Sequence, residues 1–282
     1  MSFPADRGSW RPAAVAAALL LWCGAHYSPA QALRVCADPN NLPFSNRAGQ
    51  GFENHIAELM AHDLGVPLRY TWWPQRRGFV RRTLVDGQCD VVLGLPAGYP
   101  GVALTPPYYR SSWVFVTRRD RNLHLHSFDD PRLRHLTIGL HAIGAGYAST
   151  PPAVELARRG IVGRIVGYSI YGNYSSPDPP ADLLRGVARG EVDVAIAWGP
   201  LAGFFASRNA GVPLALDAIA VGSGSDTQAL TYDIAAATRA GDTATRAMLE
   251  GELRRRRPEI RRLLRDYGVP LEGMDVAPGE QP

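Results

Sequence analysis

Lysine is absent from this sequence of 282 residues, so the 30 basic side chains are all arginines. The absence excludes several classes of enzyme, because phosphate-loop NTPases, protein kinases, pyridoxal-phosphate enzymes and Schiff-base aldolases each use a lysine. The rest of the composition is ordinary for a folded protein, with 46% hydrophobic and 20% charged residues. The net charge is only +4 and the arginines are scattered along the chain, so we expect no nucleic-acid partner.

The apolar run near the amino terminus, Pro12 to Trp22, is too short to cross a bilayer, which takes about 20 residues. Arg7 and Arg11 flank the start of this run, and the small-residue motif Ala30-Gln31-Ala32 follows it. That order is typical of a secretory signal peptide. We therefore expect residues 1–32 to be removed by cleavage after Ala32, and the exported chain to have no membrane span.

Cysteine is scarce, with three residues in the whole chain. Cys23 would leave with the signal peptide, and Cys36 and Cys89 would remain, each at the edge of a predicted strand. An even pair of cysteines in an oxidising compartment favours a disulfide. The alternative is two buried thiols, because the register of the two strands is not fixed by the sequence.

Short apolar strands and amphipathic helices alternate along the rest of the chain. Phe52, Ile56, Leu59, Met60 and Leu64 recur at helical spacing and are followed by Gly65, which predicts a helix. Strands are predicted at 33–38, 68–73, 90–94, 112–117, 135–140, 164–170, 192–198 and 231–238, and further helices at 77–86, 152–159, 180–189, 200–209, 242–256 and from 258 onward. This order predicts an α/β fold with parallel sheets and helices outside them.

The alternation starts again after residue 121, which predicts two lobes. Lobe 1 would be discontinuous, with residues 33–118 and 226–282, and lobe 2 would hold residues 119–225. Each lobe would be a mostly parallel sheet flanked by helices, with a cleft between the lobes. Ligands of open α/β sheets bind outside the carboxyl ends of the strands, and the two lobes would face each other there.

Motifs for catalysis or metal binding are incomplete. Histidines and aspartates gather at His124, His126, Asp129, Asp130, His135 and His141, but no tetrahedral ligand spacing is completed. The nucleophile elbow G-x-S-x-G does not occur. We expect no catalytic residues, no metal and no cofactor, so the chain is predicted not to be an enzyme.

Several motifs, in order, carry a resemblance to a known family. The chain has LRVCADPNNLPFSN at 33–46, TWWPQRRGFVRRTL at 71–84, PPYYRSSWVFV at 106–116, GYSIYGNY at 167–174 and VDVAIAWGPLAGFFA at 192–206. Together with Gly51-Phe52-Glu53 they resemble type II periplasmic solute-binding proteins, and among these the J proteins of bacterial methanol-oxidation systems. The resemblance covers nearly all of residues 33–271. It implies a two-lobed periplasmic protein that is associated with a PQQ-dependent methanol dehydrogenase.

One stretch departs from the solute-binding pattern. Amino-acid-binding members of the family hold the ligand carboxylate with an arginine just after the third strand, whereas residues 95–101 here read LPAGYPG, without a charge. Moving a carboxylate from water into a cleft without a charged partner is costly. Arg110, Arg76 and Arg77 are the candidates to replace the missing arginine.

Aromatic residues at strand ends are the candidates for a larger occupant of the cleft, such as a segment of the dehydrogenase. They are Phe44, Trp72, Trp73, Tyr108, Tyr109, Tyr168, Tyr171 and Trp198. Trp72 and Trp198 are equally compatible with the core. Tyr108 and Tyr109 are adjacent on an extended chain, so at most one of them faces the cleft. Arg76 and Arg77 are equally compatible with a solvated position.

The sequence thus favours a periplasmic accessory protein that binds a PQQ-dependent methanol dehydrogenase during its maturation or activation. Two alternatives stay open. One is a receptor that delivers a small organic or amino acid to an ABC transporter, with that small molecule in the cleft. The other is a dehydratase-like enzyme on the same fold, which needs a cleft carboxyl group with a raised pKa; the sequence identifies no such group.

Overall fold

The computed structural model describes residues 32–142, 150–169, 178–209, 211–220 and 230–272. The predicted signal peptide (except Ala32), Tyr171, and residues 226–229 and 273–282 of the predicted lobe 1 lie outside these ranges. Within them, no helix is both long enough and apolar enough to cross a membrane.

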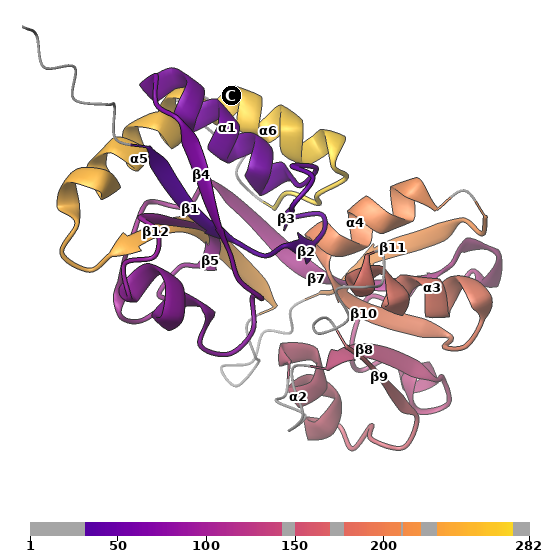
Figure 1. Cartoon of the computed structure of the whole chain (residues 1–282). Coiled ribbons are helices and arrows are strands. Elements are labelled where there is room, and N and C mark those ends of the chain that lie inside the picture. The colour runs from indigo at the N-terminus through magenta and orange to yellow at the C-terminus, as the bar shows by residue number, and fades with distance from the viewer. Residues whose placement is uncertain (1–31, 143–149, 170–177, 210, 221–229, 273–282) are drawn as a thin grey trace, which may run out of the picture.

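The elements follow the predicted alternation, with some additions (Figure 1). The strands are β1 Leu33–Ala37, β2 Asn40–Asn41, β3 Ser45–Asn46, β4 Leu68–Trp72, β5 Val91–Pro96, β6 Val102–Leu104, β7 Tyr109–Arg118, β8 Ile138–Ala142, β9 Ile165–Ser169, β10 Val194–Trp198, β11 Leu214–Ala218 and β12 Thr231–Arg239. The α-helices are α1 Phe52–Leu64, α2 Pro151–Arg158, α3 Asp182–Arg189, α4 Gly199–Arg208, α5 Thr243–Arg255 and α6 Arg257–Asp266. The short helices are η1 Arg81–Val85, η2 Arg119–Arg121, η3 Pro131–Arg134 and η4 Pro179–Ala181.

Ten of the strands form one continuous mixed sheet, where two separate and mostly parallel sheets were expected. The order is β4-β1-β5-β12-β7-β10-β8-β9, with β6 paired to β12 and β11 paired to β7. Strands are parallel within β4-β1-β5, which we call the first half, and within β10-β8-β9, which we call the second half. The chain reaches β7 from β5 without a crossover helix, so β7 does not extend the parallel set and pairs antiparallel with its neighbours.

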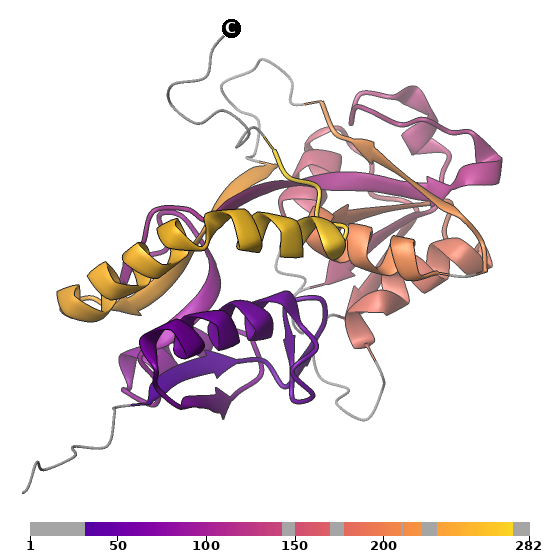
Figure 2. The same cartoon turned by 90° about the horizontal axis from the view of Figure 1, so that it is seen from above.

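The long strand β7 joins the two halves (Figure 2). Its first part, Tyr109–Ser112, pairs with β12, and its second part, from Trp113 onward, pairs with β10 and β11. The sequence predicted only the strand 112–117, which is mostly this second part. The predicted helix at 77–86 is a single π-helical turn, η1, and the short strands β6 and β11 were not predicted.

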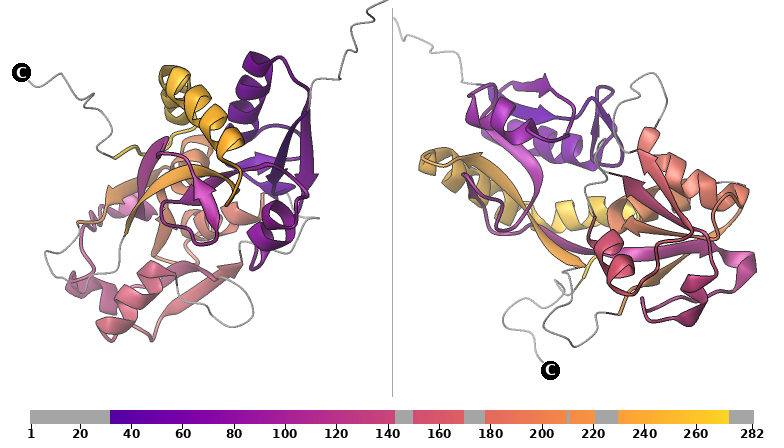
Figure 3. Two further views of the ribbon diagram at one scale, coloured as in Figure 1. Left: turned by 90° about the vertical axis from the view of Figure 1, so that its left-hand side faces the viewer. Right: turned by 90° about the horizontal axis from the view of Figure 1, so that it is seen from below.

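Helices α1, α5 and α6 lie together over one face of the first half (Figures 1 and 3). The predicted apolar stripe of α1 faces the core, because Phe52, Ile56 and Met60 are fully buried in the main core cluster. Asp63, three residues after Met60 on α1, accepts two hydrogen bonds of 2.6 Å from Arg256, between α5 and α6. This ion pair lowers the pKa of the Asp63 carboxyl group.

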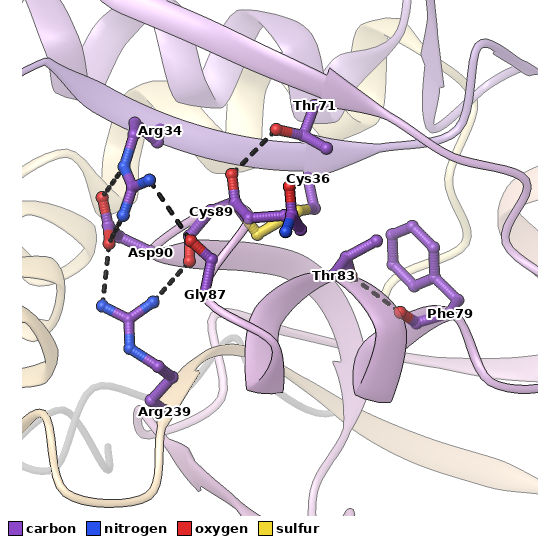
Figure 4. Close-up of a disulfide and its surroundings, with 10 residues drawn as sticks. Arg34, Cys36, Thr71, Phe79, Thr83, Gly87, Cys89, Asp90 and Arg239 are labelled. Atoms are coloured by element: carbon purple, nitrogen blue, oxygen red, sulfur yellow. Dashed lines mark hydrogen bonds and ion pairs between the residues drawn. A yellow bond between two sulfur atoms is a disulfide. The ribbon is translucent and has the colours of Figure 1, made fainter.

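A disulfide joins Cys36 of β1 to Cys89, just before β5, with the two Cα atoms 5.6 Å apart (Figure 4). The parallel pairing of β1 with β5 brings the two cysteines together, so the predicted bridge is confirmed. The neighbouring Asp90 carboxylate lies 2.7 Å from an Arg34 nitrogen and 2.8 Å from an Arg239 nitrogen. Burial alone would raise the pKa of Asp90, but the hydrogen bonds from the two arginines outweigh it and lower that pKa.

Candidate functional site

A pocket of about 210 Å³ lies where the two halves of the sheet meet, and we call it the central pocket. The carboxyl-terminal parts of β5, β8 and β10 reach it, as expected for ligand sites in α/β sheets. Both halves therefore contribute to its walls. The lining residues are Asn41, Phe44, Glu53, Gln75, Gly94, Tyr109, Trp113, His141, Thr150, Trp198, Leu201 and Ile234.

Glu53 is the acidic residue of this pocket, and the first turn of α1 positions it. The backbone N–H groups of Phe52 and Glu53 donate hydrogen bonds of 2.8 and 2.9 Å to the carbonyl groups of Pro43 and Phe44. The side chain then turns toward Gly94 of β5, where a Cβ atom would lie only 2.1 Å from Glu53 Oε1. Gly94 also has φ +76°, so this close approach and this backbone both call for glycine.

Glu53 is only 8% exposed, and no hydrogen bond to its carboxyl group is found among the described residues. Burial raises the pKa of Glu53 to about 8, and the negative charge of Asp38 adds to the shift. Asp38 accepts hydrogen bonds from the backbone N–H groups of Asn40 (2.8 Å) and Gln75 (2.6 Å). Glu53 therefore lies beside a carboxyl group that is already satisfied, while its own is not.

His141, on β8 of the second half, also lines the pocket. It is 3% exposed, and its Nε2–H donates to the carbonyl oxygen of Pro180 at 3.2 Å. Burial lowers the pKa of His141 to about 4, so the imidazole is neutral at pH 7. Aromatic rings complete the wall, with Trp198 making edge contacts to Trp113 at 6.0 Å and to Tyr232 at 5.9 Å between ring centroids.

A second and larger hollow of about 520 Å³ lies beside α4 and the end of α6, and we call it the α4–α6 groove. Phe204 and Tyr267 stack at 5.4 Å, and the Arg208 guanidinium lies 3.8 Å from the centroid of the Phe204 ring. The groove mixes apolar, aromatic and charged surface, with two arginines, Arg185 and Arg208, and one aspartate, Asp178. Its lining residues are Leu42, Gln50, Asp178, Ala181, Leu184, Arg185, Phe204, Phe205, Arg208, Asn209 and Tyr267.

Three of the aromatic candidates line the central pocket, namely Phe44, Tyr109 and Trp198. Tyr108 is buried in the main core cluster beside Tyr109 and is not part of the lining, so only one of the two adjacent tyrosines reaches the pocket.

Trp72, Trp73 and Tyr168 lie away from both hollows. Trp72 stacks on Tyr70 at 4.5 Å on the edge strand β4, and Trp73 packs near the disulfide. Tyr168 lies on the edge strand β9, with its hydroxyl 3.5 Å from the Glu191 carboxylate. Tyr171 is outside the described residues.

The three arginines proposed to replace the missing carboxylate partner do not line either hollow. Arg110 makes two hydrogen bonds of 2.8 Å to Asp233 on the neighbouring strand. Arg76 and Arg77 are exposed in the turn after β4. No arginine is present among the described residues that line the central pocket.

Sequence reasoning missed Glu53, His141 and Trp113 as pocket residues. Glu53 follows Gly51-Phe52 in a motif that supported the family resemblance, but only the fold shows that β5 buries its carboxyl group. His141 belonged to a histidine cluster considered for metal binding. In the described parts of the chain, no group of three His, Cys, Asp or Glu side chains is arranged to hold a metal ion.

Comparison with known proteins gives relatives along most of the chain, although no protein-family model matches it. MoxJ of Methylorubrum extorquens is 32% identical over 250 residues, which cover 85% of this chain and 81% of the relative. The crystal structure of the periplasmic binding protein XoxJ from Methylobacterium extorquens AM1 superposes with a TM-score of 0.69 at 36% identity. It covers 86% of this chain and 99% of that one.

The crystal structure of MxaJ from Methlophaga aminisulfidivorans MPT has a TM-score of 0.71 at 25% identity, over 85% of this chain and 99% of that one. The matches thus extend over 81% of MoxJ in sequence and over 99% of the XoxJ and MxaJ chains in structure. The chain therefore belongs to the MoxJ, XoxJ and MxaJ family of periplasmic-binding-protein homologues, which has the type II solute-binding fold.

Proposed function

We propose that this protein is a periplasmic accessory protein of a methanol-oxidation system, which binds a PQQ-dependent methanol dehydrogenase and assists its maturation or activation. The observation that carries the proposal is the match to MoxJ over 85% of the chain and to XoxJ over 86%. XoxJ is a periplasmic binding protein and neither name denotes an enzyme, so we assign the chain a binding role without catalysis.

The α4–α6 groove is the surface that best suits a protein segment. It is more than twice as large as the central pocket. Phe204, Phe205 and Tyr267 offer aromatic surface, and Arg208 is held over the Phe204 ring with its charge at the wall of the groove. Aromatic residues and arginine dominate the energetics of protein interfaces. An apolar segment that carries an acidic residue would complement this groove, because its apolar part would contact the aromatic rings and its acidic residue would pair with Arg208.

Deletion of the gene in its own host tests the accessory role. We expect methanol dehydrogenase to be unmade or inactive in the deletion strain, and the full-length gene to restore it. Intact dehydrogenase activity without this protein would contradict the proposal.

A binding experiment then tests the groove. Tagged protein should retain the purified dehydrogenase, and Arg208→Glu should lower the retained amount about tenfold or more, since it reverses a charge at an interface centre. Arg254→Glu is the matched control, because Arg254 is an exposed arginine on α5 outside both hollows. Arg76→Glu, Arg77→Glu and Arg110→Glu test the arginines singled out from the sequence. If Arg208→Glu and Arg254→Glu bind alike, the dehydrogenase docks elsewhere.

The two other functions predict different results. A transporter receptor predicts that deletion abolishes uptake of one small organic or amino acid and leaves the dehydrogenase active. The dehydratase-like alternative has one observation in its favour, the buried Glu53 carboxyl group with its raised pKa. Glu53→Gln would abolish an acid–base reaction. If deletion inactivates the dehydrogenase and the Glu53→Gln variant restores it fully, the cellular role does not use acid–base chemistry at Glu53, which excludes that alternative.

A further inference from the structure

The central pocket combines a carboxyl group with aromatic rings, and its described lining holds no cationic partner for an anion. Glu53 and His141 are its titratable residues along with Tyr109, and His141 is neutral. No arginine lines it within the described ranges, and the chain has no lysine at all. A ligand carboxylate would thus enter without a charged partner, which is costly in a buried site.

Glu53 presents an acceptor that the fold leaves unsatisfied. The residue is 8% exposed, its carboxyl group receives no hydrogen bond from the described residues, and it belongs to the pocket wall. Buried polar groups are normally hydrogen-bonded, so an unpaired one that faces a pocket indicates a missing partner. A positively charged N–H or N–CH₃ group is the partner that an isolated carboxylate favours most.

The rest of the wall suits the same kind of ligand. Phe44, Tyr109, Trp113 and Trp198 all line the pocket, and Trp198 is fixed by edge contacts to Trp113 and Tyr232. Aromatic rings attract a cation within about 6 Å of their centroids, and such rings beside a carboxylate are typical of sites for organic ammonium ions. Leu201 and Ile234 supply apolar contact for the hydrocarbon part of the ligand.

We propose that the central pocket binds a small organic ammonium ion without a carboxylate, held by the Glu53 carboxylate and the rings of Phe44, Tyr109, Trp113 and Trp198. The proposal concerns the isolated protein and does not depend on the accessory role. It excludes amino acids as the preferred ligands, although the fold is shared with proteins that bind solutes.

Binding of such a cation is coupled to the release of a proton from Glu53. Burial keeps Glu53 protonated at pH 7, and a cation binds its ionised form, so binding releases a proton and tightens as the pH rises toward 8. The other titratable groups that face Glu53 do not reverse this trend. Asp38 adds negative charge, His141 stays neutral above pH 5, and burial raises the pKa values of Tyr70, Tyr108 and Tyr109.

Calorimetric titration of the purified protein with tetramethylammonium tests the proposal, because the charge of this ion does not depend on pH. With a pKa of about 8 for Glu53, we expect binding about fifty-fold tighter at pH 8 than at pH 6. Titrations in two buffers of different ionisation enthalpy should show release of close to one proton at pH 7. Butylammonium should bind as well, whereas neutral 1-butanol and the zwitterion glycine betaine should bind at least tenfold more weakly.

Two variants assign the effect to Glu53. Glu53→Gln mimics the protonated carboxyl group, so it should fold, lose at least tenfold in affinity for tetramethylammonium at pH 8, and release no proton. Glu58→Gln removes an exposed carboxylate from the same helix and should bind like the wild type. The proposal is overturned if wild-type protein binds neither cation at pH 8, if 1-butanol binds as tightly, or if Glu53→Gln binds tetramethylammonium unchanged.

Discussion

The buried carboxyl group of Glu53 makes a quantitative prediction about stability. In the unfolded chain its pKa returns to 4.5, whereas in the folded protein it is about 8. Between these values the folded protein keeps a proton that the unfolded chain has lost, so the free energy of unfolding falls as the pH rises. Each pKa unit corresponds to about 1.4 kcal/mol, so this one group lowers the stability by about 3.5 kcal/mol between pH 5 and pH 8.

Glu53→Gln removes this dependence, because the amide has no proton to lose. We expect the variant to gain about 3.5 kcal/mol relative to the wild type between pH 5 and pH 8, with the difference levelling off above pH 9. Urea unfolding followed by tryptophan fluorescence at one-unit pH intervals measures this difference. All other titrating groups contribute equally to both proteins and cancel.

Glu58→Gln is the matched control, since Glu58 is exposed on the same helix and lies 3.2 Å from His55. Its difference from the wild type should stay within about 0.5 kcal/mol at every pH. A difference between Glu53→Gln and wild type that is flat from pH 5 to pH 9 would refute the reasoning. It would mean that the Glu53 carboxyl group is ionised in the folded protein or titrates near its ordinary pKa.

Three further predictions concern the rest of the fold. The disulfide closes a loop between cysteines 53 residues apart, so oxidised protein should be about 4 kcal/mol more stable to urea than the same protein with its thiols reduced; a gap below about 1 kcal/mol would contradict the chain-entropy account. Gly203→Ala should cost about 1–3 kcal/mol in thermal unfolding, since its Cβ would lie 1.8 Å from the Gly268 carbonyl oxygen. At Gly251 on α5 a Cβ would meet nothing within 4 Å, so Gly251→Ala should instead raise the stability by up to about 1 kcal/mol. Equal effects of Gly203→Ala and Gly251→Ala on stability would contradict the close packing at Gly203. His141, whose pKa falls from 6.5 to about 4, contributes stability that is present above pH 6.5 and is lost as the pH falls through 4. Between pH 7 and pH 3.5, the free energy of unfolding in urea should therefore fall by about 3 kcal/mol less for His141→Asn than for the wild type. If the two proteins lose the same stability over this range, His141 is not a neutral buried imidazole.

The sequence predicts local structure well where periodicity is strong. The apolar spacing of α1 gives its bounds directly, and the buried strands β1, β5, β8 and β10 follow from short apolar runs between turn residues. The pairing of Cys36 with Cys89 follows once the two strands are neighbours. The helix and the strands depend on residues that are close together in the chain, whereas the disulfide joins cysteines 53 residues apart.

The sheet and the central pocket depend on contacts between distant residues, so they are harder to predict. The division of β7 between β12 and β10 makes one mixed sheet out of two expected ones, and nothing in the local run 112–117 specifies an antiparallel neighbour. Glu53 follows an ordinary helix start, and its burial depends on Gly94, which is 41 positions away in the sequence. Trp72 was a candidate for the cleft because it ends a strand, but that strand, β4, lies at the edge of the sheet, so Trp72 is not in the pocket.

The close contact between α4 and the end of α6 links the two hollows mechanically. Gly203 and Gly268 meet with no side chain between them, and Tyr267 stacks on Phe204 across the same junction. Helix α6 covers the first half, whereas α4 packs on β7 and β10, so this contact sets the spacing of the halves. Gln50 and Tyr267, beside the helices of the first half, line the groove together with residues of α3 and α4, which pack on the second half; residues of both halves line the central pocket. An occupant that holds the groove at one width therefore fixes the width of the pocket as well, and by thermodynamic reciprocity each occupant changes the affinity for the other.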